Sequence, residues 1–334
     1  MSNLAKFLYS VGVLLFLISF SLTVYFAYQI FHIGSPVEQA NASVPRYHFV
    51  LVPEELDNDY WRLVESGAKT AAAKHNVALE YIGPTQANLE EHIKTLEMTA
   101  AARVDGIMTQ GLHEVQFTPL INQIVEKGIP VITVDTDAIQ SKRLSYIGTD
   151  NYYSGYIAGK ALIEDTGGNA KVAIITGSFH TSAQQLRVQG FKDAIKGNEG
   201  ISIVAIEESN ITRVKAADAA NKVLREHPEV TAFYGTSALD GIGIAQIVEY
   251  YKKQDDVYII AFDTIEDTID YMEKGTIEAT VMQKPYEMGY RAVEMMINLI
   301  EGKQVPPTVH TETKVIRKED LPLDSNSIIR VNPS

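Results

Sequence analysis

The longest uninterrupted hydrophobic stretch of the chain lies at its amino terminus. Residues 7–31 contain no aspartate, glutamate, lysine or arginine, and Lys6 stands directly before them. About twenty apolar residues are enough for a helix to cross the hydrocarbon core of a bilayer, where a continuous helix satisfies its own backbone amides. We therefore expect residues 7–31 to form one transmembrane helix. Lys6 favours a cytoplasmic amino terminus, which would place the chain from about residue 34 outside the cell.

A cleaved signal peptide is the alternative interpretation of this stretch. Its apolar core normally spans only about 7–15 residues and is followed closely by a small-x-small cleavage site. The nearest such pattern, Ala40-Asn41-Ala42, lies well past the end of the run. We expect a retained signal anchor, a linker over residues 34–46, and a single-pass cell-membrane protein with an extracytoplasmic soluble domain. Cleavage after Ala42 is the alternative.

Beyond the linker, short apolar runs alternate with segments whose apolar residues recur at helical spacing. The runs predict strands at residues 47–52, 78–82, 105–108, 129–134, 171–176, 201–206, 232–234, 257–261 and 279–282. The periodic segments predict helices at residues 60–75, 89–102, 117–127, 152–164, 182–196, 213–227, 241–252, 265–274 and 285–301. Near-continuous apolar strands that alternate with helices are typical of parallel sheets covered by helices on both faces.

The strand–helix pattern restarts after residue 150. This repetition predicts an α/β fold of two similar, Rossmann-like lobes with parallel sheets. Ligands of open α/β sheets bind at the carboxyl ends of the strands. If these edges of the two lobes face each other, the ligand site lies in the cleft between them.

Composition and motifs exclude several classes of function. The net charge of −13 disfavours binding to nucleic acid, and 46% hydrophobic residues are enough for a substantial core. The chain has no cysteine, which excludes a lipid-modified cysteine, disulfides and thiol chemistry. The eight histidines show no metal-binding spacing, and no nucleophile elbow or phosphate-binding loop occurs. We expect no catalytic residues, no metal and no cofactor, and therefore a protein that is not an enzyme.

Polar and aromatic side chains gather where the predicted strands end. Carboxylates, amides and a guanidinium can share vicinal hydroxyls of a sugar, and an aromatic ring can stack on the sugar's CH face. Each residue alone also has a structural interpretation, because an aspartate at a strand end often caps the next helix. The candidates from this placement are Tyr60, Trp61, Asp135, Arg187, Ser237, Asp263 and Gln283.

Alternative roles stay open for some of these positions. Asp150 and Asn151 are as well suited to cap the helix near residue 152 as to contact a ligand. Gln283 is also suited to fasten a connection between the lobes, and Arg187 to pair with a surface acid on the next turn.

Several longer motifs resemble one family. They are VDGI at residues 104–107, GIPVITVD at 128–135, IGTDN at 147–151, TSAQQLRVQGF at 181–191, IIAFD at 259–263 and GTIEATVMQKPYEMG at 275–289. Over about residues 47–316 the chain resembles the periplasmic sugar-binding proteins of the ribose/galactose type. The resemblance implies two lobes joined by a three-segment hinge, with residues 47–149 plus 284–312 in the amino-terminal lobe. Residues 150–283 plus 313–330 would form the carboxyl-terminal lobe.

The resemblance also implies a role for each matching residue. Tyr60 and Trp61 would stack on the sugar, and Asn58 would hydrogen-bond to it. Asp135 and Asp263 would accept hydrogen bonds from sugar hydroxyls, one in each lobe. The matching arginine is Arg187, and the matching glutamine at the hinge is Gln283.

Three departures from the family pattern change the expected pocket. Thr136 stands where ribose-type members carry an arginine, and Ser237-Ala238 replaces an Asn-Asp pair, with Asp240 nearby as a candidate substitute. Ile211 or a neighbour replaces an aromatic residue. We therefore expect a sugar or sugar-like polyol other than ribose, or a degenerate site in a signalling protein.

Two functions fit these expectations. The first is a monomeric extracytoplasmic solute-binding protein that closes on a sugar and presents the closed form to the permease of an ABC sugar transporter. The alternative is a membrane-anchored sensory accessory protein that reports the sugar to a histidine kinase. The uncharged amino-terminal run and the missing lipid-attachment cysteine favour the second partner.

Overall fold

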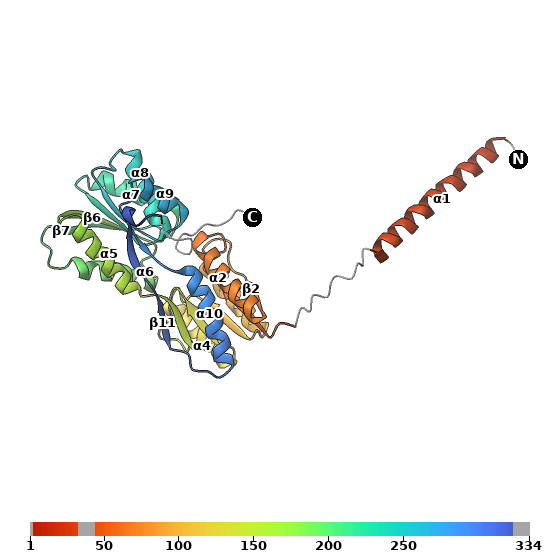
Figure 1. The fold of residues 1–334 in the computed structure, drawn as a ribbon, viewed down its shortest axis with the longest axis horizontal. Helices are drawn as coiled ribbons and strands as arrows, with labels where there is room; N and C mark the ends of the chain where they lie inside the picture. Colours follow the sequence, from red (N-terminus) through yellow and green to blue (C-terminus); the bar gives the residue numbers. More distant parts are fainter. Residues whose placement is uncertain (1–2, 33–43, 323–334) are drawn as a thin grey trace. The chain divides into compact units, whose positions relative to one another are not determined.

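The computed structural model describes residues 3–32 and 44–322 (Figure 1). The chain forms two compact units, one amino-terminal and one that begins at Arg46. Helix α1 covers Asn3–His32, which confirms the helix predicted over residues 7–31. Its segment Val11–Tyr28 has a mean hydropathy of 2.1, so by length and composition it is able to cross a membrane. Apart from residues 44–46, the predicted linker lies outside the described residues, as do residues 323–330 of the predicted second lobe.

The second unit contains two six-stranded sheets, each the centre of one lobe. The first has the order β11-β5-β4-β3-β1-β2, and its neighbouring strands are parallel. Its strands are β1 Tyr47–Val52, β2 Val77–Tyr81, β3 Gly106–Thr109, β4 Val131–Val134, β5 Ser145–Thr149 and β11 Thr308–Thr311.

The second sheet repeats this arrangement with the order β12-β10-β9-β8-β6-β7. Only its edge strand β12 is antiparallel to its neighbour, β10. Its strands are β6 Ala170–Thr176, β7 Ile201–Glu208, β8 Ala232–Gly235, β9 Tyr258–Phe262, β10 Ala279–Met282 and β12 Lys314–Arg317. The predicted fold class, two α/β lobes with mainly parallel sheets, is confirmed.

Helices cover both faces of each sheet because the strands are buried on both sides. Along β1, Phe49 and Leu51 face α2 and α10, whereas Val50 and Val52 face α3 and α4. In the second lobe, α5 and α6 cover one face and α7, α8 and α9 the other. The helices are α2 Asp59–His75, α3 Leu89–Ala101, α4 Glu114–Glu126, α5 Asn151–Asp165, α6 Ser182–Ile195, α7 Arg213–Glu226, α8 Ala238–Tyr250, α9 Glu266–Lys274 and α10 Pro285–Ile300, followed by the 3₁₀ turn η1 Lys318–Asp320.

The chain passes between the two lobes three times. It crosses from β5 to α5, from β10 to α10, and from β11 to β12. These connections lie close together, since Thr149 donates a hydrogen bond to Gln283 and Lys284 forms an ion pair with Glu312; Figure 1 shows the two lobes that they join. Helix α10 consequently packs on α2 of the first lobe, and α5 packs on α6 of the second.

Glycines bring the helices of these two pairs into backbone contact. A Cβ atom built on Gly289 of α10 would lie 1.9 Å from the carbonyl oxygen of Val64 in α2. A Cβ atom on Gly155 of α5 would lie 1.9 Å from the carbonyl oxygen of Arg187 in α6. No larger side chain fits at these crossings, so each glycine sets how closely its helix pair packs.

Three strands, β5, β11 and β12, are not predicted by the hydrophobic pattern. Their half-polar sequences, SYIGT, TVHT and KVIR, lack the apolar run that marks the other strands, and two of them are edge strands. Helices α4 and α8 begin three residues before their predicted starts at residues 117 and 241, because their first turns precede the apolar periodic positions.

Candidate functional site

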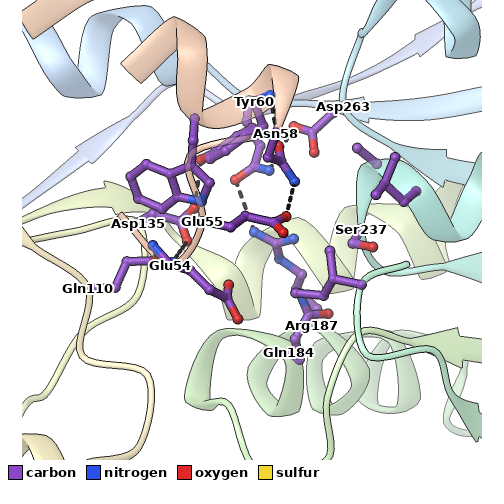
Figure 2. A pocket seen from close by; sticks show the side chains of 15 residues that line it. Glu54, Glu55, Asn58, Tyr60, Gln110, Asp135, Gln184, Arg187, Ser237 and Asp263 are labelled. Atoms are coloured by element: carbon purple, nitrogen blue, oxygen red, sulfur yellow. Dashed lines mark hydrogen bonds between the residues drawn. The ribbon is translucent and has the colours of Figure 1, made fainter. Parts of the chain in front are cut away.

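A cavity lies between the lobes at the carboxyl ends of strands from both sheets, and the empty space in it and its open mouth is about 480 Å³ (Figure 2). The first lobe lines it from the loop after β1, the start of α2, and the residues after β3 and β4. The second lobe contributes residues from α6, from the loops after β7, β8 and β9, and from the connection after β10. The lining residues are Glu54, Glu55, Asn58, Tyr60, Trp61, Gln110, Asp135, Gln184, Arg187, Ile211, Ser237, Ala238, Leu239, Asp263 and Gln283.

The start of α2 is fixed by its N-cap residue, Asn58. The Oδ1 atom of Asn58 accepts a hydrogen bond from the backbone N–H of Tyr60 at 2.9 Å. Its Nδ2 atom donates to Oε1 of Glu55 at 2.6 Å. Asn58 therefore orients the turn that places Tyr60 and Trp61 at the cavity, and part of its hydrogen-bonding capacity is already used.

Asp135 follows β4 in the left-handed region, with φ of +66°. Its carboxylate accepts hydrogen bonds from the hydroxyl of Tyr60 at 2.6 Å, from Nε2 of Gln110 at 3.1 Å and from the hydroxyl of Thr136 at 3.0 Å. Burial raises the pKa of Tyr60 well above its usual value, so its hydroxyl stays protonated and donates. Thr136, where the resemblance leads us to expect an arginine in ribose-type members, therefore helps to hold this aspartate.

Arg187 is buried, with 3% of its surface exposed. It donates from Nε to Oδ1 of Asn151 at 2.8 Å, from Nη1 to the carbonyl oxygen of Thr236 at 2.8 Å, and from Nη2 to Oε1 of Gln283 at 3.0 Å. Its guanidinium also lies over the ring of Phe262, 4.1 Å from the centroid. The alternative in which Arg187 pairs with a surface acid is therefore wrong.

Asp263 is the counterpart of Asp135 in the second lobe, and it also has φ of +66°. Its Oδ1 atom accepts a hydrogen bond from Nε2 of Gln283 at 2.8 Å. Burial raises the pKa of Asp263 to about 7, although the charge of Arg187 acts in the opposite direction. Gln283 also accepts a hydrogen bond from the hydroxyl of Thr149 at 2.6 Å, so it joins two of the three connections between the lobes.

The remaining predicted residues lie on different sides of the cavity wall. Ser237 is the N-cap of α8 and lines the cavity. Asp240, one turn later, is fully buried behind the wall and accepts hydrogen bonds from the hydroxyls of Ser209 and Thr236. Burial raises its pKa to about 6. At the hinge, the alternative capping role applies to Asp150, whose carboxylate accepts from the backbone N–H of Tyr153 at 2.9 Å.

Several lining residues were not among the predicted site residues. Glu54 and Glu55 come directly after Pro53 at the end of β1, and Gln110 follows β3. A polar residue at a strand end is the same signal that identified Asp135, so these three residues were open to prediction. Gln184 lies one helical turn before Arg187 and faces the same cavity.

The combined set of side chains suits a neutral polyhydroxylated ligand. Carboxyl and amide groups from both lobes can accept and donate hydrogen bonds, and Tyr60 and Trp61 supply aromatic surface. Four carboxyl groups line the cavity beside one guanidinium, which disfavours an anionic ligand. Within residues 3–32 and 44–322, no cluster of histidine, aspartate or glutamate suited to hold a metal ion is found.

The lobes also touch at the rims of the cavity. On one rim, Leu63 of α2 packs against an apolar cluster of the second lobe that contains Leu239 and Ile265. On another, the rings of His113 and His180 stack with centroids 6.1 Å apart. The hydroxyl of Ser182 donates to the carbonyl oxygen of Asp137 at 3.2 Å. These contacts join the lobes independently of the three connecting segments.

The chain is similar to a known protein family and to several known sugar-binding proteins. A family model described as "Periplasmic binding protein domain" matches residues 49–304. A crystal structure of GanP, a glucose-galactose binding protein from Geobacillus stearothermophilus, is 63% identical, with a TM-score of 0.82 over 83% of this chain and 99% of that one.

Two further relatives extend the comparison. The structure of a XylFII–LytSN complex is 38% identical, with a TM-score of 0.78 over 82% of this chain and 99% of that one. The ribose import binding protein RbsB of Escherichia coli K12 is 25% identical over 277 residues, which are 80% of this chain and 90% of that protein.

Proposed function

The chain belongs to the periplasmic binding protein domain family, and from this premise we propose that it captures a neutral hexose of the glucose or galactose type between its lobes. Proteins of this family are extracytoplasmic, and its sugar-binding members are of the type that serves ABC transporters. The observation that carries the proposal is the cavity itself. Asp135 and Asp263 line it from opposite lobes, Arg187 lies beside Asp263, and Tyr60 and Trp61 form an aromatic wall.

Ligand contacts to both lobes provide the mechanism. A sugar that bonds to Asp135 on one lobe and to Asp263 and Arg187 on the other makes all of these contacts only when the lobes are closed. Such a ligand shifts the population toward the closed form. The movement takes place at the three connecting segments, two of which are joined by the hydrogen bond between Thr149 and Gln283.

The choice of a hexose rests on two observations. Thr136 and Ser237 depart from the ribose pattern, and GanP, the 63% identical neighbour, is named a glucose-galactose binding protein. The proposal is tested with the full-length chain in phosphatidylcholine nanodiscs, because detergents with sugar head groups would compete for the site. Thermal unfolding is measured with glucose, galactose, ribose, xylose, arabinose, inositol, glucuronate and glucose 6-phosphate.

We expect glucose or galactose to raise the unfolding temperature. Binding to the folded state alone stabilises it by about 2.7 kcal/mol at a hundredfold excess over Kd. Glucuronate and glucose 6-phosphate should give no shift, because the cavity already carries four carboxyl groups. A shift with ribose alone would refute the choice of a hexose, and a panel with no shift at all would refute the sugar-binding role.

For the closed form we propose a partner in the membrane. The apolar helix α1 is suited to anchor the domain there, and the XylFII–LytSN complex shows a 38% identical chain bound to a second protein. These two observations favour a sensory membrane protein of the histidine kinase class. The relatives named as import proteins and ABC transporter solute-binding proteins favour the alternative, a transporter permease.

Cross-linking in the native membrane separates the two partners. A photoreactive amino acid replaces Leu15 or Phe16 in α1, whose side chains are exposed, and the cross-linked protein is identified after growth with the sugar. A kinase in the cross-link supports the sensory role. A permease supports transport, and recovery of a chain that begins near Ser43 would show that the helix is removed.

A further inference from the structure

Glu54 occupies a fixed position in the loop after β1. Its backbone N–H donates to Oε1 of Gln110 at 2.8 Å, and Nε2 of the same glutamine donates to Asp135 at 3.1 Å. Pro53 precedes it and is buried. The backbone of Glu54 is therefore held by the same side chain that orients the first-lobe aspartate.

The carboxyl group of Glu54 reaches into the cavity. Figure 2 shows it between Gln110 and the second-lobe residues Gln184 and Arg187. Both carboxyl oxygens of its neighbour Glu55 already accept hydrogen bonds from the protein. Oε1 accepts from Nδ2 of Asn58 at 2.6 Å, and Oε2 accepts from the backbone N–H of Ala87 at 3.3 Å. For Glu54, no hydrogen bond or ion pair to the carboxyl group is found within residues 44–322, so both of its oxygens are available to a ligand.

The groups around this carboxyl oppose a negative charge on it. From its own lobe it faces the carboxyl groups of Glu55 and Asp135, and from the other lobe Asp263 and Arg187 line the same cavity. Tyr60 completes the titratable set and stays protonated. Burial, followed by the charges of Glu55 and Asp135, raises the pKa of Glu54 to about 8.

We propose that Glu54 is a specificity-determining residue that binds a ligand hydroxyl as a neutral carboxylic acid. Its O–H donates to the hydroxyl oxygen of the ligand, and its carbonyl oxygen accepts the hydroxyl proton of the same or the adjacent group. This arrangement matches the donor and acceptor of a sugar hydroxyl group, and it adds no charge to a cavity already rich in carboxylates. The inference rests on the proposed sugar-binding function and deepens it, because it predicts how binding depends on pH.

The sign of this dependence follows from the protonated state that binds. The proton is present below a pH of about 8, so Glu54 adds no pH dependence to the affinity there. Above that pH the free protein must take up a proton in order to bind, and affinity falls about tenfold for each further pH unit. Asp263 titrates near pH 7 and affects only the lower range, and Tyr60 titrates above the range studied.

Isothermal titration calorimetry of the full chain in nanodiscs tests the proposal with galactose and glucose between pH 6.5 and 9.5. We expect wild-type affinity to fall about tenfold between pH 8.5 and 9.5. Titrations at pH 9 in buffers of different ionisation enthalpy should show uptake of close to one proton per sugar bound.

Three variants isolate the carboxyl group. Glu54→Gln keeps a donor and an acceptor without a titrating proton, so it should bind at pH 7 and show neither the fall nor the proton uptake. Glu54→Ala should bind at least tenfold more weakly at pH 7. Glu278→Gln is the matched control, because burial raises the pKa of Glu278 to about 7 at the end of β9 remote from the cavity. It should keep the wild-type pH profile.

Two results would overturn the inference while leaving sugar binding intact. One is a wild-type affinity that stays flat to pH 9.5, and the other is a Glu54→Gln variant that keeps the fall and the proton uptake. If neither sugar binds at any pH, the proposed function fails and this inference fails with it.

Discussion

The two lobes have the same strand order, yet they hold their aspartates in different ways. Asp135 follows β4, the third strand from the β11 edge of its sheet, and Asp263 follows β9, the third strand from the β12 edge. Both residues have φ of +66°. Asp135 is bonded to Tyr60, Gln110 and Thr136, which all belong to its own lobe. Asp263 is bonded to Gln283, which lies in a connection between the lobes.

The site therefore has a fixed half around Asp135 and a hinge-sensing half around Asp263, whose hydrogen bond depends on a hinge residue. The first-lobe aspartate keeps its hydrogen bonds whatever the angle between the lobes, because every donor moves with it. The second-lobe aspartate depends on Gln283, which is bonded to Thr149 at another crossing. A ligand that binds Asp263 therefore acts directly on the segments that bend during closure.

Arg187→Met should have the largest effect on sugar affinity, because Arg187 holds the hinge-sensing half of the site in place. The variant removes three hydrogen bonds to Asn151, Thr236 and Gln283 and the cation beside Asp263. Removing one partner from a buried, charged hydrogen-bond network costs about 2–5 kcal/mol, so sugar affinity should fall by about a hundredfold or more in calorimetry. Arg213→Met, which removes an exposed pair with Asp267, is the control and should bind within about twofold of wild type.

Exchange of each aspartate for asparagine sharpens the comparison. Asp263→Asn should weaken sugar binding by about 2 kcal/mol or more, with a small change in the unfolding temperature. Asp135→Asn should also weaken binding, and in addition it should destabilise the fold, since three buried donors share this acceptor. Calorimetry and thermal unfolding of both variants measure these quantities. Equal losses of stability would contradict the division into a fixed and a hinge-sensing half.

The glycines at the helix crossings allow a third comparison. Gly155→Ala forces α5 away from the backbone of Arg187, so it should lower stability by about 1–3 kcal/mol and also weaken sugar binding. Gly289→Ala makes the equivalent clash with Val64 in the first lobe. Val64 does not line the cavity, so this variant should weaken sugar binding less than Gly155→Ala while losing a similar amount of stability. Parallel denaturant unfolding and calorimetry decide the point, and equal effects on affinity would count against it.

The smallest expected effect is an opposite response of the lobes to acid. Burial lowers the pKa of His92 in the first lobe to about 4, so stability falls as the pH drops from about 6.5 to 4. In the second lobe burial raises the pKa of Asp240 to about 6, so stability increases as the pH drops from about 6 to 4. Between pH 7 and pH 5, each effect is on the order of 1–2 kcal/mol.

Hydrogen exchange of backbone amides, read separately for the two sheets, measures this response. The measurement uses the Glu54→Gln variant as background, because the raised pKa of Glu54 would itself stabilise the first lobe as the pH falls. In this background, protection at pH 5 relative to pH 7 should decrease in the first sheet and increase in the second sheet. His92→Gln should remove the first effect. Asp240→Asn should reduce the second, to which the raised pKa values of Asp263 and Glu278 also contribute. A uniform change across both sheets would show that these two groups do not control the response.

How far the sequence predicts the strands of this molecule depends on how continuous their apolar runs are. Strands with a continuous apolar run are predicted. The edge strands β11 and β12 carry polar residues and are not predicted, and neither is β5, whose polar residues are buried inside the sheet. The aspartates were found because parallel strands gather their carboxyl ends at one edge.

Side-chain direction marks the limit of prediction within the site. Asp240 stands only three residues after Ser237, but the helical turn directs its carboxyl group into the core, while Ser237 lines the cavity. Trp61 both lines the cavity and packs in the first-lobe core, two roles that its position at a helix start does not distinguish. The position of Glu54 depends on Gln110, which is distant in sequence, and that of Glu55 on Ala87 as well as on the nearby Asn58.

The three crossings between the lobes also govern the order in which the protein becomes complete during translation. A nascent chain that ends after Met282 lacks α10 and β11 of the first lobe and β12 of the second. Neither sheet receives its last edge strand until residues 308–317 have been translated. A single protease cut after Met282 would, by the same connectivity, remove an element from both lobes at once.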